Sequence, residues 1–310
     1  MTGPGAERTG AGEKLRADGV LLFITAVWGG TFVVVKDALG HADPFTFLAV
    51  RFALGGTVAA AVAGRAMLRP DVLRAGAILG AFLFAGYGFQ TAGLVFTTES
   101  RSAFITGLAV VLVPFVSFAV NRRVPKPPSL VGVALALVGL YVLTGGLSSA
   151  SAAGADSRGD VILGDLLTLG CALTFAVHIA LTERFAPKLP AMALVAVQLW
   201  CVCLLSLLVL PITGARVSWT GELLYAAAFT GVFASAMAIG LQTWAQARTT
   251  AVRAALIFSL EPVMAAALSY GLGREEPAAR ELAGGALLIS AVLIAEVGNA
   301  LWARRQVSVG

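Results

Sequence analysis

Ten apolar runs of about 18 to 25 residues, joined by short polar connections, constrain this chain more than any other feature. A helix rises about 1.5 Å per residue, so each run is long enough to cross about 30 Å of hydrocarbon. Lipid offers no partner to unpaired backbone groups, and the alternating segments of an outer-membrane barrel are absent, so helices are the economical interpretation. We predict an all-α integral membrane protein with spans near residues 18–36, 45–64, 72–96, 102–120, 129–147, 162–181, 191–210, 222–243, 252–272 and 282–303.

Charged residues are too few to coat a water-soluble globule of this size. The 310 residues include 22 Lys and Arg and 17 Asp and Glu, or 13% of the chain, against roughly 25% in soluble domains. Mean hydropathy is +0.87. This composition excludes a soluble enzyme, a secreted disulfide scaffold and a nucleic-acid-binding domain. The three cysteines lie inside apolar runs, and we interpret them as packing residues rather than metal ligands or a disulfide.

The basic residues alternate between the two sides of the predicted layout. In the connections and at the ends of the spans, 15 Lys and Arg residues fall on one side and 6 on the other, and Arg51 alone lies deep inside a span. Connections rich in Lys and Arg stay in the cytoplasm. We therefore predict a bacterial inner-membrane protein with an even number of crossings and cytoplasmic tails at residues 1–17 and 304–310.

The two halves of the chain resemble each other. At offsets of 146 to 148 residues, Pro44 falls on Pro190, Lys36-Asp37 on Thr182-Glu183, and Pro114 on Pro262. Each half holds five predicted spans, an odd number, so the second half must enter the membrane from the opposite face. This is an inverted-topology repeat, with repeats at 18–147 and 162–303, a linker at 148–161 and a substrate site expected near the midplane between them.

Six residues inside the spans are candidates for lining a central substrate cavity: Trp28, Arg51, Gln90, His178, Gln198 and Glu261. A charge at the bilayer centre costs on the order of 3 kcal/mol on insertion scales, so it needs a partner, a watery cavity or a function. Glu261 lies near the middle of its span and precedes Pro262, which we expect to kink the helix, as we expect Pro114 to do in the first half. Glu261 is a candidate for proton coupling or for pairing with a substrate amine; the alternative is a structural link between helices.

The other candidates carry similar alternatives. Arg51 would bind a substrate carboxylate, or else extend to the membrane interface or bridge two helices. His178 would relay protons, or be hydrogen-bonded to a neighbour. Gln90 and Gln198 would line the cavity or find partners in the bundle. Trp28, followed by two glycines, would form an apolar cavity wall with one N–H donor.

Several stretches resemble a known family. Residues 26–36 (AVWGGTFVVVK), Asp43-Pro44 and residues 48–52 (LAVRF) are similar to the opening of an EamA repeat of the drug/metabolite transporter superfamily. Residues 259–266 (SLEPVMAA) and 273–276 (GREE) resemble the end of the second repeat. The resemblance covers residues 18–303 and implies a bundle of two inverted five-helix repeats that moves small metabolites by alternating access.

The predicted function is secondary active transport of amino acids or similar amphipathic metabolites, with export expected because it is the commoner direction among family relatives. The sequence contains no phosphate-binding loop, metal-ligand cluster or nucleophile with a paired base, so we expect no cofactor, metal, ATP or nucleic acid and no enzymatic activity. The expected partners are lipid, a small-molecule substrate and a proton as the coupling ion; the oligomeric state stays open. The alternatives are a passive channel and an intramembrane enzyme.

Overall fold

The computed structural model describes residues 11–97, 99–122, 124–144, 158–271 and 278–307, and these residues fold into helices. The first half contains α1 (Ala11–Gly29), α2 (Thr31–Ala38), α3 (Pro44–Ala63), η1 (Gly64–Leu68), α4 (Pro70–Phe96), α5 (Glu99–Gly107), α6 (Ala109–Asn121) and α7 (Pro127–Thr144). The second half contains α8 (Arg158–Phe185), η3 (Ala186–Lys188), α9 (Ala191–Thr213), α10 (Gly221–Phe229), the π-helix η4 (Thr230–Met237), α11 (Ala238–Gln246), α12 (Ala251–Phe258), α13 (Glu261–Gly271) and α14 (Ala279–Val307).

The predicted all-helical membrane class is confirmed, and the count of spans is confirmed in part. In the described part of the chain, eight helical segments are long and apolar enough to cross a membrane: 12–38, 44–68, 70–96, 102–121, 162–188, 191–213, 221–246 and 279–302. The fifth predicted span is a shorter apolar helix at Pro127–Leu143, and the ninth is divided into α12 and α13. The structure therefore supports eight to ten crossings.

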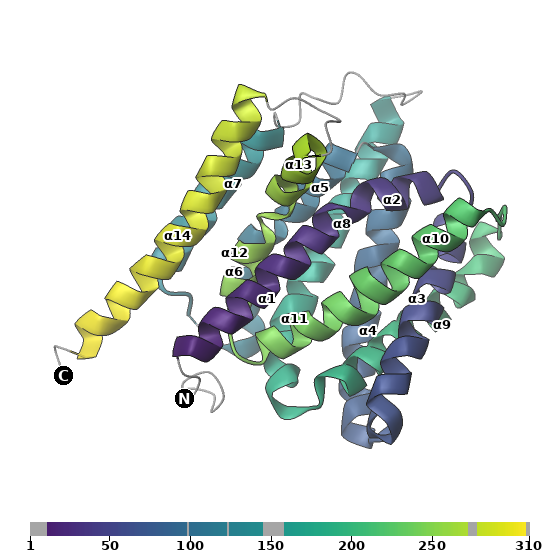
Figure 1. The fold of residues 1–310 in the computed structure, drawn as a ribbon, viewed down its shortest axis with the longest axis horizontal. Coiled ribbons are helices and arrows are strands. Elements are labelled where there is room, and N and C mark those ends of the chain that lie inside the picture. Colours follow the sequence, from purple (N-terminus) through teal and green to yellow (C-terminus); the bar gives the residue numbers. More distant parts are fainter. Residues whose placement is uncertain (1–10, 98, 123, 145–157, 272–277, 308–310) are drawn as a thin grey trace.

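The packing of the helices repeats itself when the two halves are exchanged. Helix α3 packs on α9 and α7 on α14, and each of these pairs joins a helix to its counterpart in the other half. Helix α6 packs on α12, which brings the two divided spans together. The contact of α4 with α8 has its equivalent in that of α1 with α11, and the contact of α4 with α9 in that of α3 with η4. The bundle thus has the arrangement of two related repeats that share one interior (Figure 1).

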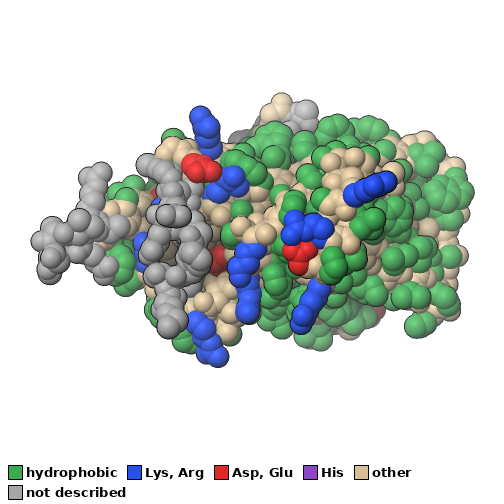
Figure 2. All heavy atoms as spheres, turned by 90° about the horizontal axis from the view of Figure 1, so that it is seen from below, with side chains coloured by type: hydrophobic (Ala, Val, Ile, Leu, Met, Phe, Trp, Pro, Cys, Tyr) green, Lys and Arg blue, Asp and Glu red, His purple; other side chains and the backbone are tan. Residues whose placement is uncertain are grey.

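The two ends of the bundle differ in charge. Helix α1 begins and α14 ends at the same, lower end of Figure 1, which we call the inner end after the predicted orientation; the α2–α3 connection marks the outer end. Figure 2 views the inner end and shows Lys and Arg side chains spread over it, with few carboxylates and a wide hydrophobic surface beside them. Exposed basic residues of the connections predicted to be cytoplasmic include Arg16, Arg65, Arg74, Arg184 and Lys188.

A tie between the halves holds the outer end. The backbone N–H of Asp43 donates to the carbonyl of Arg216 (2.9 Å), and that of Ser218 donates to the carbonyl of His41 (2.7 Å), around the Ala42–Val217 bridge. The buried Asp43 carboxylate accepts from the backbone N–H of Arg216 at 2.8 Å and also caps the first turn of α3. The connections before α3 and before α10 therefore lie at the same end of the bundle, as the predicted even number of crossings between them requires.

Replacing Asp43 with alanine is expected to destabilise the protein by about 2 kcal/mol, because it removes the cap of α3 and leaves buried N–H donors without an acceptor. Asp43→Asn keeps one acceptor oxygen and should lose less. Apparent melting temperatures in detergent at neutral pH test the order wild type, Asn, Ala. Equal stability of all three proteins would show that this tie does not stabilise the fold.

The same carboxylate predicts a pH dependence. Burial raises the pKa of Asp43, but hydrogen bonds from Thr46, Arg216 and Phe45 outweigh it and hold the pKa below its usual value of 3.8. The stabilisation is therefore complete above the unfolded value and is lost as the pH falls through the lower folded value. The difference in melting temperature between wild type and Asp43→Asn should be constant near neutral pH and should narrow below pH 3.8. A difference in melting temperature that stays constant in acid would show that the Asp43 carboxylate is not the source of this pH dependence.

Candidate functional site

A cavity lies between the two repeats at the level where several helices are interrupted. It has an empty volume of about 1040 Å³, which includes solvent at its opening. Its polar lining residues are Thr31, Arg51, Tyr87, Gln90, Thr91, Thr106, His178, Gln242, Ser259 and Glu261, and its large aromatic lining residues are Trp28, Phe32, Phe175 and Phe258. The cavity wall is thus aromatic and aliphatic with a few polar groups, as is typical of small-molecule sites.

Interrupted helices bring backbone and polar groups to this cavity. Helix α12 ends at Phe258 and α13 begins at Glu261, where Pro262 supplies no N–H to the carbonyl of Phe258. In the equivalent span of the first half, the chain turns at Leu108 between α5 and α6, and Pro114 lies farther along, inside α6. Both spans therefore divide where they line the cavity.

Arg51 is a buried cation on the cavity wall. Its side chain is 2% exposed, and its Nε donates to Ser235 Oγ at 3.0 Å. Its guanidinium carbon lies 4.7 Å from the centre of the Tyr87 ring and 5.1 Å from that of Phe52. No carboxylate of a described residue lies within ion-pair distance of it. Arg51 therefore offers a positive charge held in place by a hydroxyl and two rings.

The π-helix η4 explains how Arg51 is held. Ser235 Oγ donates to the carbonyl of Thr230, five residues earlier (2.9 Å), so its own oxygen faces Arg51. Gly55 of α3 and Gly231 of η4 are in backbone contact, since a Cβ at Gly55 would lie 2.5 Å from the Gly231 carbonyl. A side chain at either position would separate the two helices, so these glycines place Ser235 beside Arg51. Single π turns of this kind are frequent at functional sites.

Glu261 is the carboxyl group of the cavity. It lies at the start of α13, and among the described residues it makes no hydrogen bond and no ion pair. Arg51, the basic residue of the cavity wall, forms no ion pair with Glu261. The described cavity wall therefore holds one cation, Arg51, and one carboxyl group, Glu261, and these two groups do not form an ion pair with each other.

The remaining sequence candidates divide into wall residues and supports. His178 Nε2 lies 2.8 Å from Gln198 Oε1, and Gln198 lies behind His178 rather than on the cavity wall. Gln198 Nε2 is buried without a described partner. Gln90 Nε2 donates to Thr106 Oγ1 at 3.3 Å across the cavity wall. Gln198 therefore contacts the wall residue His178 and does not itself line the cavity.

Trp28 forms an apolar part of the wall. Its indole N–H donates to the carbonyl of Ala234 in η4 (2.9 Å), and its ring meets Phe258 edge-on at 5.3 Å between centroids. The indole N–H that we predicted as a donor in the cavity wall is therefore used within the protein. Tyr87, whose ring packs on Arg51 and on Phe175, is a wall residue that the sequence did not distinguish from a packing residue.

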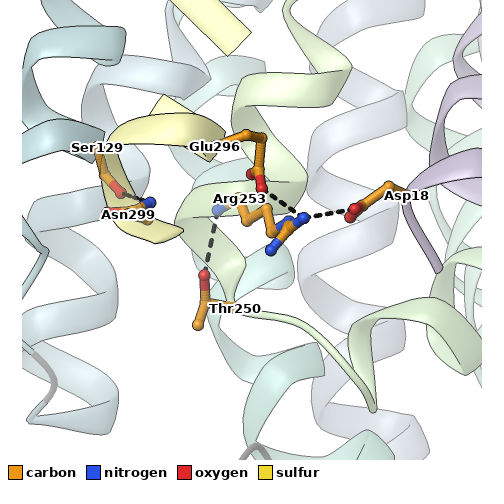
Figure 3. Close-up of polar contacts among 6 residues, drawn as sticks. All are labelled: Asp18, Ser129, Thr250, Arg253, Glu296 and Asn299. Atoms are coloured by element: carbon orange, nitrogen blue, oxygen red, sulfur yellow. Dashed lines mark hydrogen bonds and ion pairs between the residues drawn. The ribbon is translucent and has the colours of Figure 1, made fainter. Parts of the chain in front are cut away.

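A second polar cluster lies outside the cavity, at the inner end (Figure 3). Arg253 of α12 forms ion pairs with Asp18 of α1 (2.5 Å) and with Glu296 of α14. Nearby, Asn299 Nδ2 donates to Ser129 Oγ at 2.8 Å, which joins α14 to α7. The cluster connects the first helix of one repeat to the last helices of the other.

Arg253→Ala is expected to lower stability by roughly 2 kcal/mol, because it leaves two carboxylates facing each other without a cation. The value lies below that of a fully buried pair because the Arg253 side chain is 27% exposed. Arg248→Ala is the matched control: among the described residues Arg248 forms one ion pair, with Glu13, whose side chain is 46% exposed, and its loss should cost less. Similar melting temperatures for the two variants would contradict a special role for Arg253.

The chain is similar to a known family of transporters. The model of the EamA-like transporter family matches residues 16–145 and 162–296. An uncharacterized transporter of Archaeoglobus fulgidus is 32% identical over 282 residues, covering 91% of this chain and 86% of that protein. A probable amino-acid metabolite efflux pump of Salmonella typhimurium is 26% identical over 297 residues, covering 90% of this chain and 94% of that protein.

Among the solved structures that are similar, a crystal structure has a TM-score of 0.76 at 20% identity, covering 96% of this chain and 99% of that one. The family model matches each half of the chain once, which agrees with the two repeats seen in the packing. The predicted resemblance is confirmed, and the family and its relatives are transporters rather than enzymes. This multi-pass membrane protein belongs to the EamA-like transporter family, within the drug/metabolite transporter group.

Proposed function

We propose that this transporter is a secondary carrier for zwitterionic amino acids or similar amphipathic metabolites. One observation carries the proposal: an apolar cavity between the repeats holds an arginine and a carboxyl group, and neither forms an ion pair with a described residue. A zwitterion would satisfy both groups, with its carboxylate on Arg51 and its ammonium on Glu261. The aromatic wall would cover an apolar side chain.

The transport cycle follows from the repeat. Two repeats of opposite orientation that rock about a shared cavity would open it to each side in turn. Glu261 is placed to exchange a proton for a substrate amine, which would couple transport to a proton gradient. The relative named as an efflux pump for amino-acid metabolites supports export as the direction. The basic inner end supports an inner-membrane orientation with both termini in the cytoplasm.

A matched set of three ligands tests the substrate class by thermal shift of the purified protein. The set is an apolar amino acid, its amide, which lacks the carboxylate, and the corresponding acid, which lacks the amine. We expect the amino acid to raise the melting temperature most, and in a saturable way, since it alone satisfies both groups. Equal shifts from all three compounds would show that the cavity does not recognise a zwitterion.

A passive channel is the second candidate, but no feature of the described residues specifically favours it. It would give no saturable binding in the same experiment.

A further inference from the structure

A buried carboxylate closes the bundle below the cavity. Glu183, near the end of α8, is 7% exposed and accepts three hydrogen bonds at Oε2. The donors are Asn121 Nδ2 (3.1 Å) and Ser117 Oγ (3.3 Å) of α6 and the backbone N–H of Ala251 (3.2 Å), the first residue of α12. Glu183 thus joins α8 and α12 of the second repeat to α6 of the first. A carboxylate at the N-terminus of a helix also interacts favourably with the helix dipole.

This junction lies past the cavity on α6, α8 and α12, three of the helices that line it. On α8 the lining residues His178 and Ile179 precede Glu183 by about one turn. On α12 the lining begins at Ala255, one turn after Ala251. A further bond from Gln246 Nε2 to the carbonyl of Ile179 (3.1 Å) closes the same region. Access to the cavity from the inner end therefore requires these contacts to separate.

The repeat places an equivalent carboxylate at the other end. Asp37, at the end of α2, corresponds to Glu183 at an offset of 146 residues. Just as α8 leads from the cavity to Glu183, α2 leads from the lining residues Phe32 and Val35 to Asp37. Helix α2 also packs on α5, the counterpart of the contact between α8 and α12. Yet Asp37 is exposed, and its side chain makes no hydrogen bond or ion pair with a described residue.

We propose that Glu183 and Asp37 are alternating latches of the transport cycle. In this structure Glu183 holds the inner end closed while Asp37 is exposed at the outer end. When the cavity opens inward, the Glu183 contacts break and Asp37 accepts hydrogen bonds at the first turn of α5, which begins at Glu99. The inference rests on the proposed alternating-access function, and it adds two residues outside the cavity that set which end is closed.

Thiol labelling from each side of the membrane tests the latch. In a background with Cys171, Cys201 and Cys203 replaced by alanine, Thr91→Cys reports access from the outer side and Ile179→Cys access from the inner side, since both positions line the cavity. A membrane-impermeant maleimide is applied to oriented vesicles. Glu183→Ala is expected to speed inner labelling by about tenfold and to slow outer labelling, because the closed inner state loses three hydrogen bonds to a carboxylate.

Asp37→Ala is expected to act in the opposite direction, reducing inner labelling, because the inward-open state loses its outer latch. Glu222 lies near the same end, and its side chain is 81% exposed. Glu222→Ala is the control and should change neither labelling rate. If Glu183→Ala does not fold, Glu183→Gln keeps one acceptor oxygen and should give a smaller shift in the same direction.

Unchanged inner labelling in a folded Glu183 variant, or shifts in the same direction for the Glu183 and Asp37 variants, would overturn the latch. Failure of the proposed function looks different. In a channel, both reporters would be labelled from both sides at once, with or without a substitution at position 183.

Discussion

Replacing Glu261 with glutamine is expected to remove the response of transport to a pH gradient. A carboxyl group in the cavity can bind and release a proton during each cycle, and an amide of nearly the same size cannot. Uptake into proteoliposomes with an imposed gradient should therefore fall to the rate seen without one. Substrate should still bind, because Arg51 and the aromatic wall are unchanged.

Two controls make the Glu261 result specific. Glu261→Asp keeps a carboxyl group and should retain at least part of the gradient response. Glu296→Gln removes a carboxyl group that lies outside the cavity, in the Arg253 cluster, and should leave the gradient response intact. A Glu261→Gln protein that still accumulates substrate in response to the gradient would show that Glu261 does not couple protons.

Replacing Arg51 with alanine is expected to weaken binding of a carboxylated substrate by about 100-fold, since removal of one partner of a buried charge-assisted pair costs about 2–5 kcal/mol. Binding of the amide analogue should change by no more than about threefold, because the amide never made that pair. Dissociation constants of the amino acid and of its amide, measured for the wild type and the variant, give this difference.

Two further substitutions separate recognition from structure at Arg51. Arg51→Lys keeps the charge but not the planar fork of donors, so an intermediate loss is expected. Ser235→Ala removes the hydrogen bond to Nε but leaves the charge of Arg51, so it should weaken binding of the amino acid only modestly. If Arg51→Ala weakens acid and amide equally, the arginine serves the packing of α3 against η4 rather than substrate recognition.

The helices were largely predictable because lipid leaves few choices to an apolar run. The span predicted at 45–64 is α3 at Pro44–Ala63, where Asp43 caps the helix and Pro44 occupies its first turn. The ninth predicted span was less accurate. It was predicted as one helix at 252–272, but the chain divides at Ser259 and Leu260, because Pro262 removes a donor and the cavity allows the backbone to turn.

The partners of the polar residues could not be predicted. Nothing in the sequence distinguishes η4 from an ordinary helix, so the contact of Arg51 with Ser235, 184 positions away, was out of reach. Gln198 was predicted as a wall candidate, yet its spacing cannot tell the cavity from the space behind His178. The position of Arg253 at the start of its predicted span likewise does not reveal that its side chain pairs with Asp18 and Glu296 on two other helices. Such contacts depend on how distant helices pack.

Exchange transport in proteoliposomes tests most directly whether one cavity serves both sides in turn. Vesicles preloaded with unlabelled amino acid are diluted into a trace of the labelled compound, with no pH gradient. Alternating access predicts saturable uptake that the internal substrate accelerates above the rate of empty vesicles. Linear uptake that the internal substrate does not accelerate would contradict a carrier and would identify a pore open to both sides.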